Sequence, residues 1–256
     1  MAGNAQKQIN IMTKKEMAHI IEQLKDDDNY YGEFGQQFLS NSNIRTLRKD
    51  PLNFGKPTES HLNLVKGQYF HNLVLEPEKI TNFTIIDAST RNTNIYKEES
   101  AGEICLLKKE EEELKELVDI MLSNPTARNL IRDVDVEYEV PGLTQLEGEW
   151  WKMKADIKNN TQSLIVDIKT TGDIEKFASS AWEYNYDSQA YIYSTYFNMD
   201  FVFVVMCKSS KRLGIFDCSP EFLLRGREKV IQAVEDYRKY TDKSFDPRAY
   251  FMEKTL

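Results

Sequence analysis

A series of strand-like segments that is interrupted once, by a helix-like segment, constrains the fold most. The strand-like segments are rich in β-branched and aromatic side chains, and they are residues 134–140, 149–157, 163–171, 201–210 and 212–219. Between the third and the fourth, residues 174–198 carry apolar side chains at the helical period, with a break predicted near residues 183–186. Other helices are predicted at residues 12–33, 39–51, 59–79, 108–124 and 220–242. This order predicts an α/β fold in which helices flank a central mixed β-sheet.

The chain has 256 residues, of which 41% are hydrophobic, and this is enough for one domain with a substantial core. We therefore expect residues 1–256 to form a single domain. Residues 1–38 are predicted to be an N-terminal helical extension, and residues 242–256 a C-terminal tail. Residues 87–102 are polar and carry no apolar period, so they are predicted to form a mobile loop.

The net charge of −8 argues against a protein that coats nucleic acid non-specifically, although a locally basic groove remains compatible with it. No segment has the apolar run of a signal peptide or of a membrane-spanning helix, so we expect no membrane association. The three cysteines lack the paired spacing of a zinc or iron–sulfur site, and free thiols fit a reducing cytoplasm. The expected location is therefore cytoplasmic, in a bacterial host cell if the chain is encoded by a phage.

Two acidic side chains mark consecutive strand-like segments. Asp156 and Asp167 are eleven residues apart, so antiparallel neighbouring strands can bring both carboxylates to one end of the sheet. Lys169 shares a strand face with Asp167, because side chains alternate with a period of two. Carboxylates can hold a hard divalent cation beside a scissile phosphate, and a lysine can orient the attacking hydroxide. The pattern is thus compatible with phosphodiester hydrolysis, and equally with two charged surface strands.

Other polar side chains can join this cluster. Glu137 and Glu139 lie at alternate positions of the preceding strand, so either can add a carboxylate, or both can line a solvated edge. His71 lies in a predicted helix, where a single histidine is more often a hydrogen-bonded, partly buried residue than a ligand. Gln189 and Tyr193 are four residues apart on one helix face, which suits contacts with a phosphate backbone or core packing of the tyrosine.

These segments occur in an order that resembles a known family. The stretches "GQYFHNLVLEP", "KADI", "IVDIKTT" and "QAYIY", together with Glu137, are similar to motifs of the RecB-like branch of the PD-(D/E)XK nuclease superfamily. The closest resemblance is to the catalytic domain of the phage-type exonuclease VIII, and it extends from about residue 39 to residue 240. It implies a restriction-endonuclease-like core and a single nuclease domain. Lys154-Ala155 stands where that family usually has Gly or Arg-Pro.

The resemblance implies a role for each matching residue. His71, Asp156 and Asp167 would hold the metal, with the carbonyl of Ile168 as a further ligand. Lys169 would be the catalytic lysine, and Glu137 the acidic residue before the hairpin, although Glu139 remains the alternative. A further pair, Gln189 and Tyr193, would contact DNA.

The function expected from this resemblance is that of a Mg²⁺-dependent exodeoxyribonuclease, with Mn²⁺ as a possible substitute. It would resect linear double-stranded DNA ends processively for single-strand annealing recombination. Its partners would be DNA, an annealing protein and further copies of the chain in a ring, trimer or tetramer. A nuclease of the same superfamily that prefers single strands or particular structures, and a non-catalytic DNA-binding module, are the alternatives. The candidate backbone contacts are Arg45, Arg48, Lys49, Lys66, Lys152 and Lys176.

Overall fold

The structure is a computed structural model that describes residues 12–56 and 60–250. In this part of the chain, five strands form one mixed sheet in the order β3-β4-β5-β6-β7, and β1 and β2 form a separate parallel pair. The strands are β1 (Ile85–Ile86), β2 (Leu106–Leu107), β3 (Val136–Leu146), β4 (Glu149–Asn159), β5 (Leu164–Thr171), β6 (Asp200–Cys207) and β7 (Leu213–Asp217). All neighbours in the sheet are antiparallel except β5 and β6, which are parallel.

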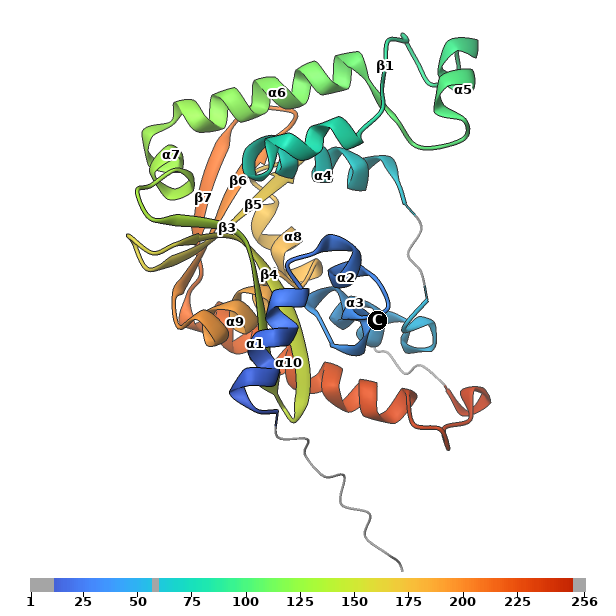
Figure 1. The fold of residues 1–256 in the computed structure, drawn as a ribbon, viewed down its shortest axis with the longest axis vertical. Helices are drawn as coiled ribbons and strands as arrows, with labels where there is room; N and C mark the ends of the chain where they lie inside the picture. The colour runs from blue at the N-terminus through green and yellow to red at the C-terminus, as the bar shows by residue number, and fades with distance from the viewer. Residues whose placement is uncertain (1–11, 57–59, 251–256) are drawn as a thin grey trace, which may run out of the picture.

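Helices cover both faces of this sheet (Figure 1). The α-helices are α1 (Lys14–Gln23), α2 (Asp27–Tyr31), α3 (Asn41–Lys49), α4 (Leu62–Leu75), α5 (Asn94–Ser100), α6 (Lys108–Ser123), α7 (Pro125–Ile131), α8 (Phe177–Glu183), α9 (Tyr186–Phe197) and α10 (Pro220–Tyr240). Short 3₁₀ turns are η1 (Gly35–Gln37), η2 (Pro51–Asn53), η3 (Pro77–Asn82) and η4 (Pro247–Ala249). The predicted α/β fold with a central mixed sheet is confirmed.

Two hydrophobic cores lie on opposite sides of the sheet, as strand alternation requires. One contains alternate residues of β6, such as Phe201 and Phe203, with apolar side chains of α3, α9 and α10. The other contains Val202 and Val204 with side chains of α4, α6 and α7. Since both faces of β6 are covered, the strand is apolar at successive positions rather than at alternate ones.

The parallel pairing of β5 with β6 requires a crossover, and α8 and α9 provide it. The break predicted near residues 183–186 is confirmed, since α8 ends at Glu183 and α9 begins at Tyr186. Asn185 between them adopts the left-handed conformation with φ of 60°, which asparagine tolerates better than most residues. The two helices therefore meet at a sharp corner.

The structure corrects the prediction of a loop at residues 87–102. Residues 94–100 form α5, which the Thr93 side chain caps by accepting a hydrogen bond from the Tyr96 N–H at 3.3 Å. The ring of Tyr96 is buried, and its hydroxyl hydrogen-bonds the backbone of Cys105. A cap and one buried aromatic side chain order this segment, although it lacks an amphipathic period.

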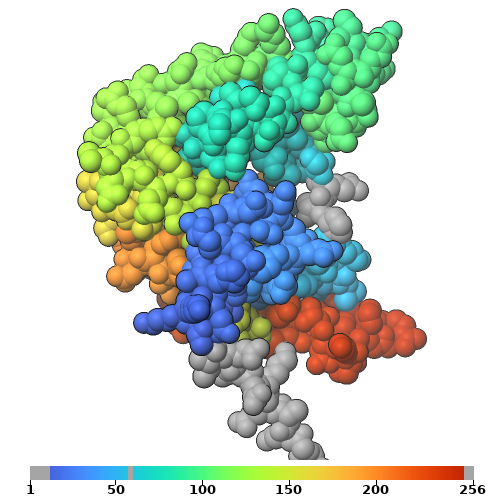
Figure 2. Space-filling model, in the orientation of Figure 1, coloured from blue at the N-terminus to red at the C-terminus, as the bar shows by residue number. Residues whose placement is uncertain are grey.

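The described part of the N-terminal extension contains α1, α2 and η1. Thr13 forms the capping box with Glu16 at the start of α1. In Figure 2 these residues, in blue, lie on the surface between the helices of residues 62–131 and the C-terminal helix. Within residues 12–56 and 60–250, no helix combines the length and the apolar character needed to span a membrane.

Candidate active site

The site lies where the sheet divides. β4 and β5 pair only through Ile157↔Val166, Lys158↔Ile165 and Asn159↔Leu164. The next residues along the two strands are Asp156 and Asp167, and beyond them β5 stays paired with β6 while β4 continues with β3. The Ile168 N–H donates to Asp156 Oδ2 at 3.1 Å instead of to a strand partner. The division therefore leaves both carboxylates beside a gap between strands.

A histidine and two carboxylates converge at this point. Nδ1 of His71, from α4, lies 3.5 Å from Asp156 Oδ2. Three ligand atoms lie within 4.8 Å of one another, one each from His71, Glu139 and Asp156, and all three residues are partly buried. Burial, together with the Lys169 ammonium, lowers the pKa of His71 to about 4, so its imidazole is neutral at pH 7 and can donate a lone pair. This donor set of one imidazole and two carboxylates fits a divalent cation.

Asp167 lies beside this set, and its side chain hydrogen-bonds that of Asp156. Its carboxylate is 2% exposed and accepts hydrogen bonds from Lys169 Nζ at 2.6 Å and from Gln189 Nε2 at 2.6 Å. Burial and the neighbouring Asp156 raise the pKa of Asp167 to about 7. Although burial alone would lower the pKa of Lys169, the two aspartates raise it above its ordinary value. The lysine is therefore a cation held against the site by Asp167.

The structure places Glu139, not Glu137, in the cluster. Glu137 is half exposed, and its Oε1 accepts from Lys158 Nζ at 2.7 Å and from Asn160 Nδ2 at 2.9 Å. Burial and the Asp156 carboxylate raise the pKa of Glu139 to about 8. The assignment of Glu137 to the site is corrected accordingly, because its cross-strand neighbour is Lys158.

A sequence signal could have distinguished the two glutamates. Glu147 and Gly148 both have positive φ, as a two-residue hairpin turn between β3 and β4 requires. Glu139 lies eight residues before Glu147, and Asp156 lies eight residues after Gly148. Counting back from the turn therefore places Glu139 opposite Asp156.

The two helical residues expected to contact DNA have different surroundings. Gln189 reaches into the site and holds Asp167. The Tyr193 side chain, in contrast, is buried, and its hydroxyl donates to the Lys154 carbonyl at 3.1 Å. Tyr193 therefore packs beneath β4, and this corrects the prediction that it contacts DNA. The Ile168 backbone hydrogen-bonds both Asp156 and His71, whereas metal binding by its carbonyl stays a prediction.

The basic residues that are predicted to contact the DNA backbone have different surroundings. Arg45, Arg48 and Lys49 lie exposed on α3, beside the corner between α8 and α9. Lys152 is buried, with its ammonium bonded to the Tyr30 carbonyl, so it cannot contact a phosphate backbone. Lys66 forms an ion pair of 2.8 Å with Glu110, and Lys176 is largely exposed.

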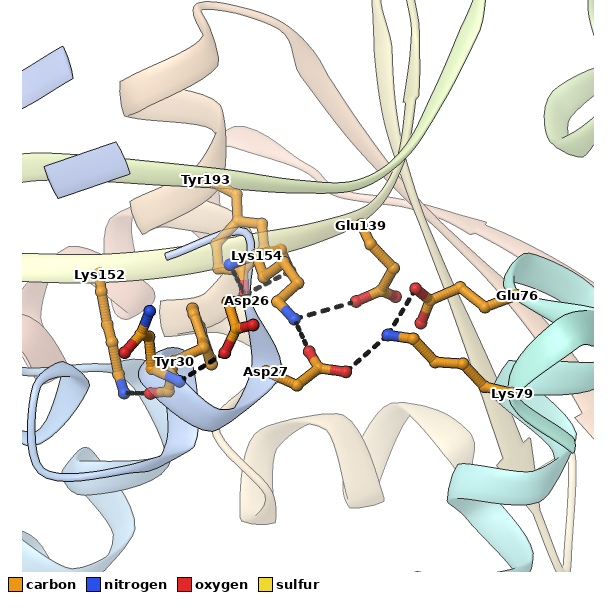
Figure 3. A network of polar contacts seen from close by, with 10 residues as sticks. Asp26, Asp27, Tyr30, Glu76, Lys79, Glu139, Lys152, Lys154 and Tyr193 are labelled. Atoms are coloured by element: carbon orange, nitrogen blue, oxygen red, sulfur yellow. Dashed lines mark hydrogen bonds and ion pairs between the residues drawn. The ribbon is translucent and has the colours of Figure 1, made fainter. Parts of the chain in front are cut away.

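A chain of alternating charges connects the site to the N-terminal segment (Figure 3). The Lys154 ammonium lies 3.6 Å from Glu139 Oε2 and also bonds Asp27 of α2. Asp27 in turn bonds Lys79 at 2.5 Å, and Lys79 bonds Glu76 at 2.6 Å. Sequence reasoning missed this network, because nothing in the local pattern indicates that residues 27 and 154 meet. The network anchors α2 next to Glu139.

A mixed five-stranded sheet that is flanked by helices and carries Asp156 and Asp167-x-Lys169 where it divides is consistent with the PDDEXK-like class of proteins. Residues 40–250 match the family described as PDDEXK-like domain of unknown function (DUF3799), and the chain belongs to this family. No curated protein matches the chain.

A solved structure of another protein has the same fold. The chain resembles the "Putative exonuclease" of Eubacterium rectale with a TM-score of 0.67 and 14% identity, over 90% of this chain and 95% of that one. It also matches a phage-related exonuclease from Haemophilus somnus 129PT with a TM-score of 0.32 and 16% identity, over 76% of this chain and 92% of that one. At 14% identity, the likeness to the Eubacterium rectale structure concerns the fold alone.

Proposed function

We propose that the protein is a metal-dependent deoxyribonuclease, and specifically an exonuclease that digests linear double-stranded DNA from its ends. The observation that carries the proposal is the convergence of His71, Glu139 and Asp156 beside the Asp167–Lys169 pair. Carboxylates and a neutral imidazole that can hold a metal, with a cationic amine beside them, suit phosphodiester hydrolysis. The name of the Eubacterium rectale relative agrees with this activity.

His71, Glu139 and Asp156 would hold the cation, and Asp167, which hydrogen-bonds Asp156, would join them by turning from Lys169. When bound, a divalent cation lowers the pKa of water and neutralises charge on the phosphate. The carboxylate donors favour Mg²⁺ or Mn²⁺ among available ions.

The residues of the chain contribute orientation and charge. Lys169 donates hydrogen bonds to the attacking water and to the scissile phosphate, where negative charge develops. Asp167 keeps this ammonium protonated and in place, and Gln189 in turn fixes Asp167. Because Lys169 is partly buried, water competes little for its charge.

The wider proposal follows the resemblance in the sequence. Resection for single-strand annealing recombination, in the bacterial cytoplasm, would pair this enzyme with an annealing protein. A ring of several copies would give processive digestion. The recombination role, the annealing partner and the ring rest on the resemblance and not on the geometry of the site.

End-labelled linear duplex DNA, incubated with protein and Mg²⁺, tests the activity. We expect nucleotides to be released from the wild type, no release with EDTA, and no release by Lys169→Met. Covalently closed circles and single strands in parallel reactions separate exonuclease from endonuclease and strand preference. Equal digestion by wild type and Lys169→Met would exclude the proposed site.

A further inference from the structure

Two aromatic side chains are exposed at the corner between α8 and α9. Trp182 is 56% exposed and Tyr184 is 46% exposed. Single exposed apolar side chains are common on protein surfaces, so a binding role for these two rings depends on the groups around them. We refer to these two residues and three cations of α3 as the aromatic corner; the cations are Arg45, Arg48 and Lys49.

The corner is held rigidly from beneath. Lys229 of α10 is buried and donates to the Trp182 carbonyl at 2.7 Å and to the fully buried Asp187 at 2.7 Å. Gly226 permits this close approach, because a Cβ there would lie 2.1 Å from the Asp187 carbonyl oxygen. From the other side, Asn41 Nδ2 donates to the Asn185 carbonyl at 3.1 Å. The exposed rings therefore project from a fixed backbone.

The cations give the corner the charge that a polyanion needs. The Arg45 guanidinium lies 5.6 Å from the centre of the Tyr184 ring, and Arg48 Nη1 donates to Asn185 Oδ1 at 3.1 Å. Lys49 is half exposed, with Glu183 3.8 Å away as its loose partner. Aromatic rings beside cations form the usual surface for single-stranded nucleic acid, in which bases stack and phosphates pair with charge.

The corner is also continuous with the catalytic residues. The Tyr184 ring lies 6.0 Å from that of Tyr186, measured between centres. The Lys169 ammonium lies 5.2 Å from the centre of the Tyr186 ring. A strand whose phosphate reaches Lys169 can thus place its neighbouring bases on Tyr184 and Trp182.

We propose that the aromatic corner binds unpaired bases of single-stranded DNA next to the active site. This inference rests on the proposed nuclease function and specifies its substrate: the strand enters the site already separated from its complement. Double-stranded DNA keeps its bases stacked within the helix, so it cannot use the two rings in this way. The corner therefore discriminates between a frayed end and an intact duplex.

Fluorescence anisotropy with labelled oligo(dT) and with a blunt duplex tests the inference, in a Lys169→Met background that prevents digestion. Trp182→Ala and Tyr184→Ala should each weaken oligo(dT) binding about 5- to 150-fold, the usual effect of losing one stacked base. Duplex binding should change little. Ile95→Ala, which truncates a 53% exposed side chain on α5, is the matched control.

Phenylalanine variants show whether a loss of binding in the alanine variants comes from the lost ring or from misfolding. Trp182→Phe and Tyr184→Phe keep a stacking ring and should retain most of the affinity. Oligo(dT) should also quench the tryptophan fluorescence of the Lys169→Met protein, and this quenching should vanish with Trp182→Phe. Quenching that persists would place the bases elsewhere and overturn the inference.

Two further outcomes separate the possible failures. If the wild type digests DNA but the alanine variants bind oligo(dT) as Ile95→Ala does, the corner is not a stacking surface, and the nuclease proposal stands. If the wild type digests nothing, the nuclease proposal fails, while the binding data still decide the role of the rings. Dissociation of an oligomer by Trp182→Ala in sedimentation would make the corner a subunit interface and overturn the inference.

Discussion

Replacing Gln189 with alanine removes the hydrogen bond that its Nε2 donates to Asp167 Oδ1 at 2.6 Å. Asp167 is only 2% exposed, so water replaces the lost donor poorly. A hydrogen bond to a charged group contributes about 1.5–3 kcal/mol. A loss of this size agrees with the roughly 10- to 100-fold lower metal affinity that follows removal of a group supporting a metal ligand. We therefore expect Gln189→Ala to bind Mn²⁺ about 10- to 100-fold more weakly.

Isothermal titration calorimetry with Mn²⁺ measures this loss directly. Gln232→Ala is the matched control, because Gln232 is a surface residue of α10 whose side chain makes only a weak contact of 3.4 Å with Asp236. Raising the Mn²⁺ concentration should restore most of the activity of Gln189→Ala. Unchanged Mn²⁺ affinity together with weakened DNA binding would refute the reasoning, and would return Gln189 to the DNA-contacting role that the sequence predicts.

Glu139→Gln should weaken Mn²⁺ binding, whereas Glu137→Gln should not, since only the former carboxylate lies in the cluster; equal losses in calorimetry would contradict the placement. Lys229→Met leaves a buried carboxylate without its cation, so the free energy of unfolding should fall by about 3–5 kcal/mol and the melting temperature by roughly 6–20 °C. Thermal unfolding checks this against the exposed Lys239→Met, and similar melting of both variants would show that the ion pair contributes little. Because burial raises the pKa of Asp167 from 3.8 to about 7, the folded metal-free protein binds more protons than the unfolded chain, and it should lose stability as the pH rises through that interval. Mg²⁺ competes with these protons, so it should raise the melting temperature more above pH 7 than below it; a pH-independent increase would argue against binding at this carboxylate.

The sequence predicts the fold well because its signals are local. Apolar character at successive positions of residues 201–207 indicates a strand covered on both faces, and the break near residues 183–186 lies where two helices meet. The position of Asp156 and Asp167 at one end of the β4–β5 pairing follows in the same way from strand length and spacing.

The remaining features depend on contacts between distant segments. Alternation alone cannot choose between Glu137 and Glu139, because the choice depends on the register set by the hairpin turn. Whether a tyrosine such as Tyr193 faces solvent or the core depends on the packing of α9 under β4. The link between Asp27 and Lys154 joins residues 127 positions apart. No local pattern indicates that Asp27 and Lys154 meet.

Leu39 lies against the part of β4 that is not paired with β5, and this contact affects how the protein behaves at high concentration. Leu39 donates its N–H to the Trp150 carbonyl at 2.9 Å and accepts from the Lys152 N–H at 2.8 Å. Unpaired strand edges recruit strands from other copies and promote aggregation. By bonding β4 at residues 150–152, the backbone of Leu39 makes this stretch of the strand edge unavailable as a template for intermolecular β-pairing, while the sheet stays divided at Asp156.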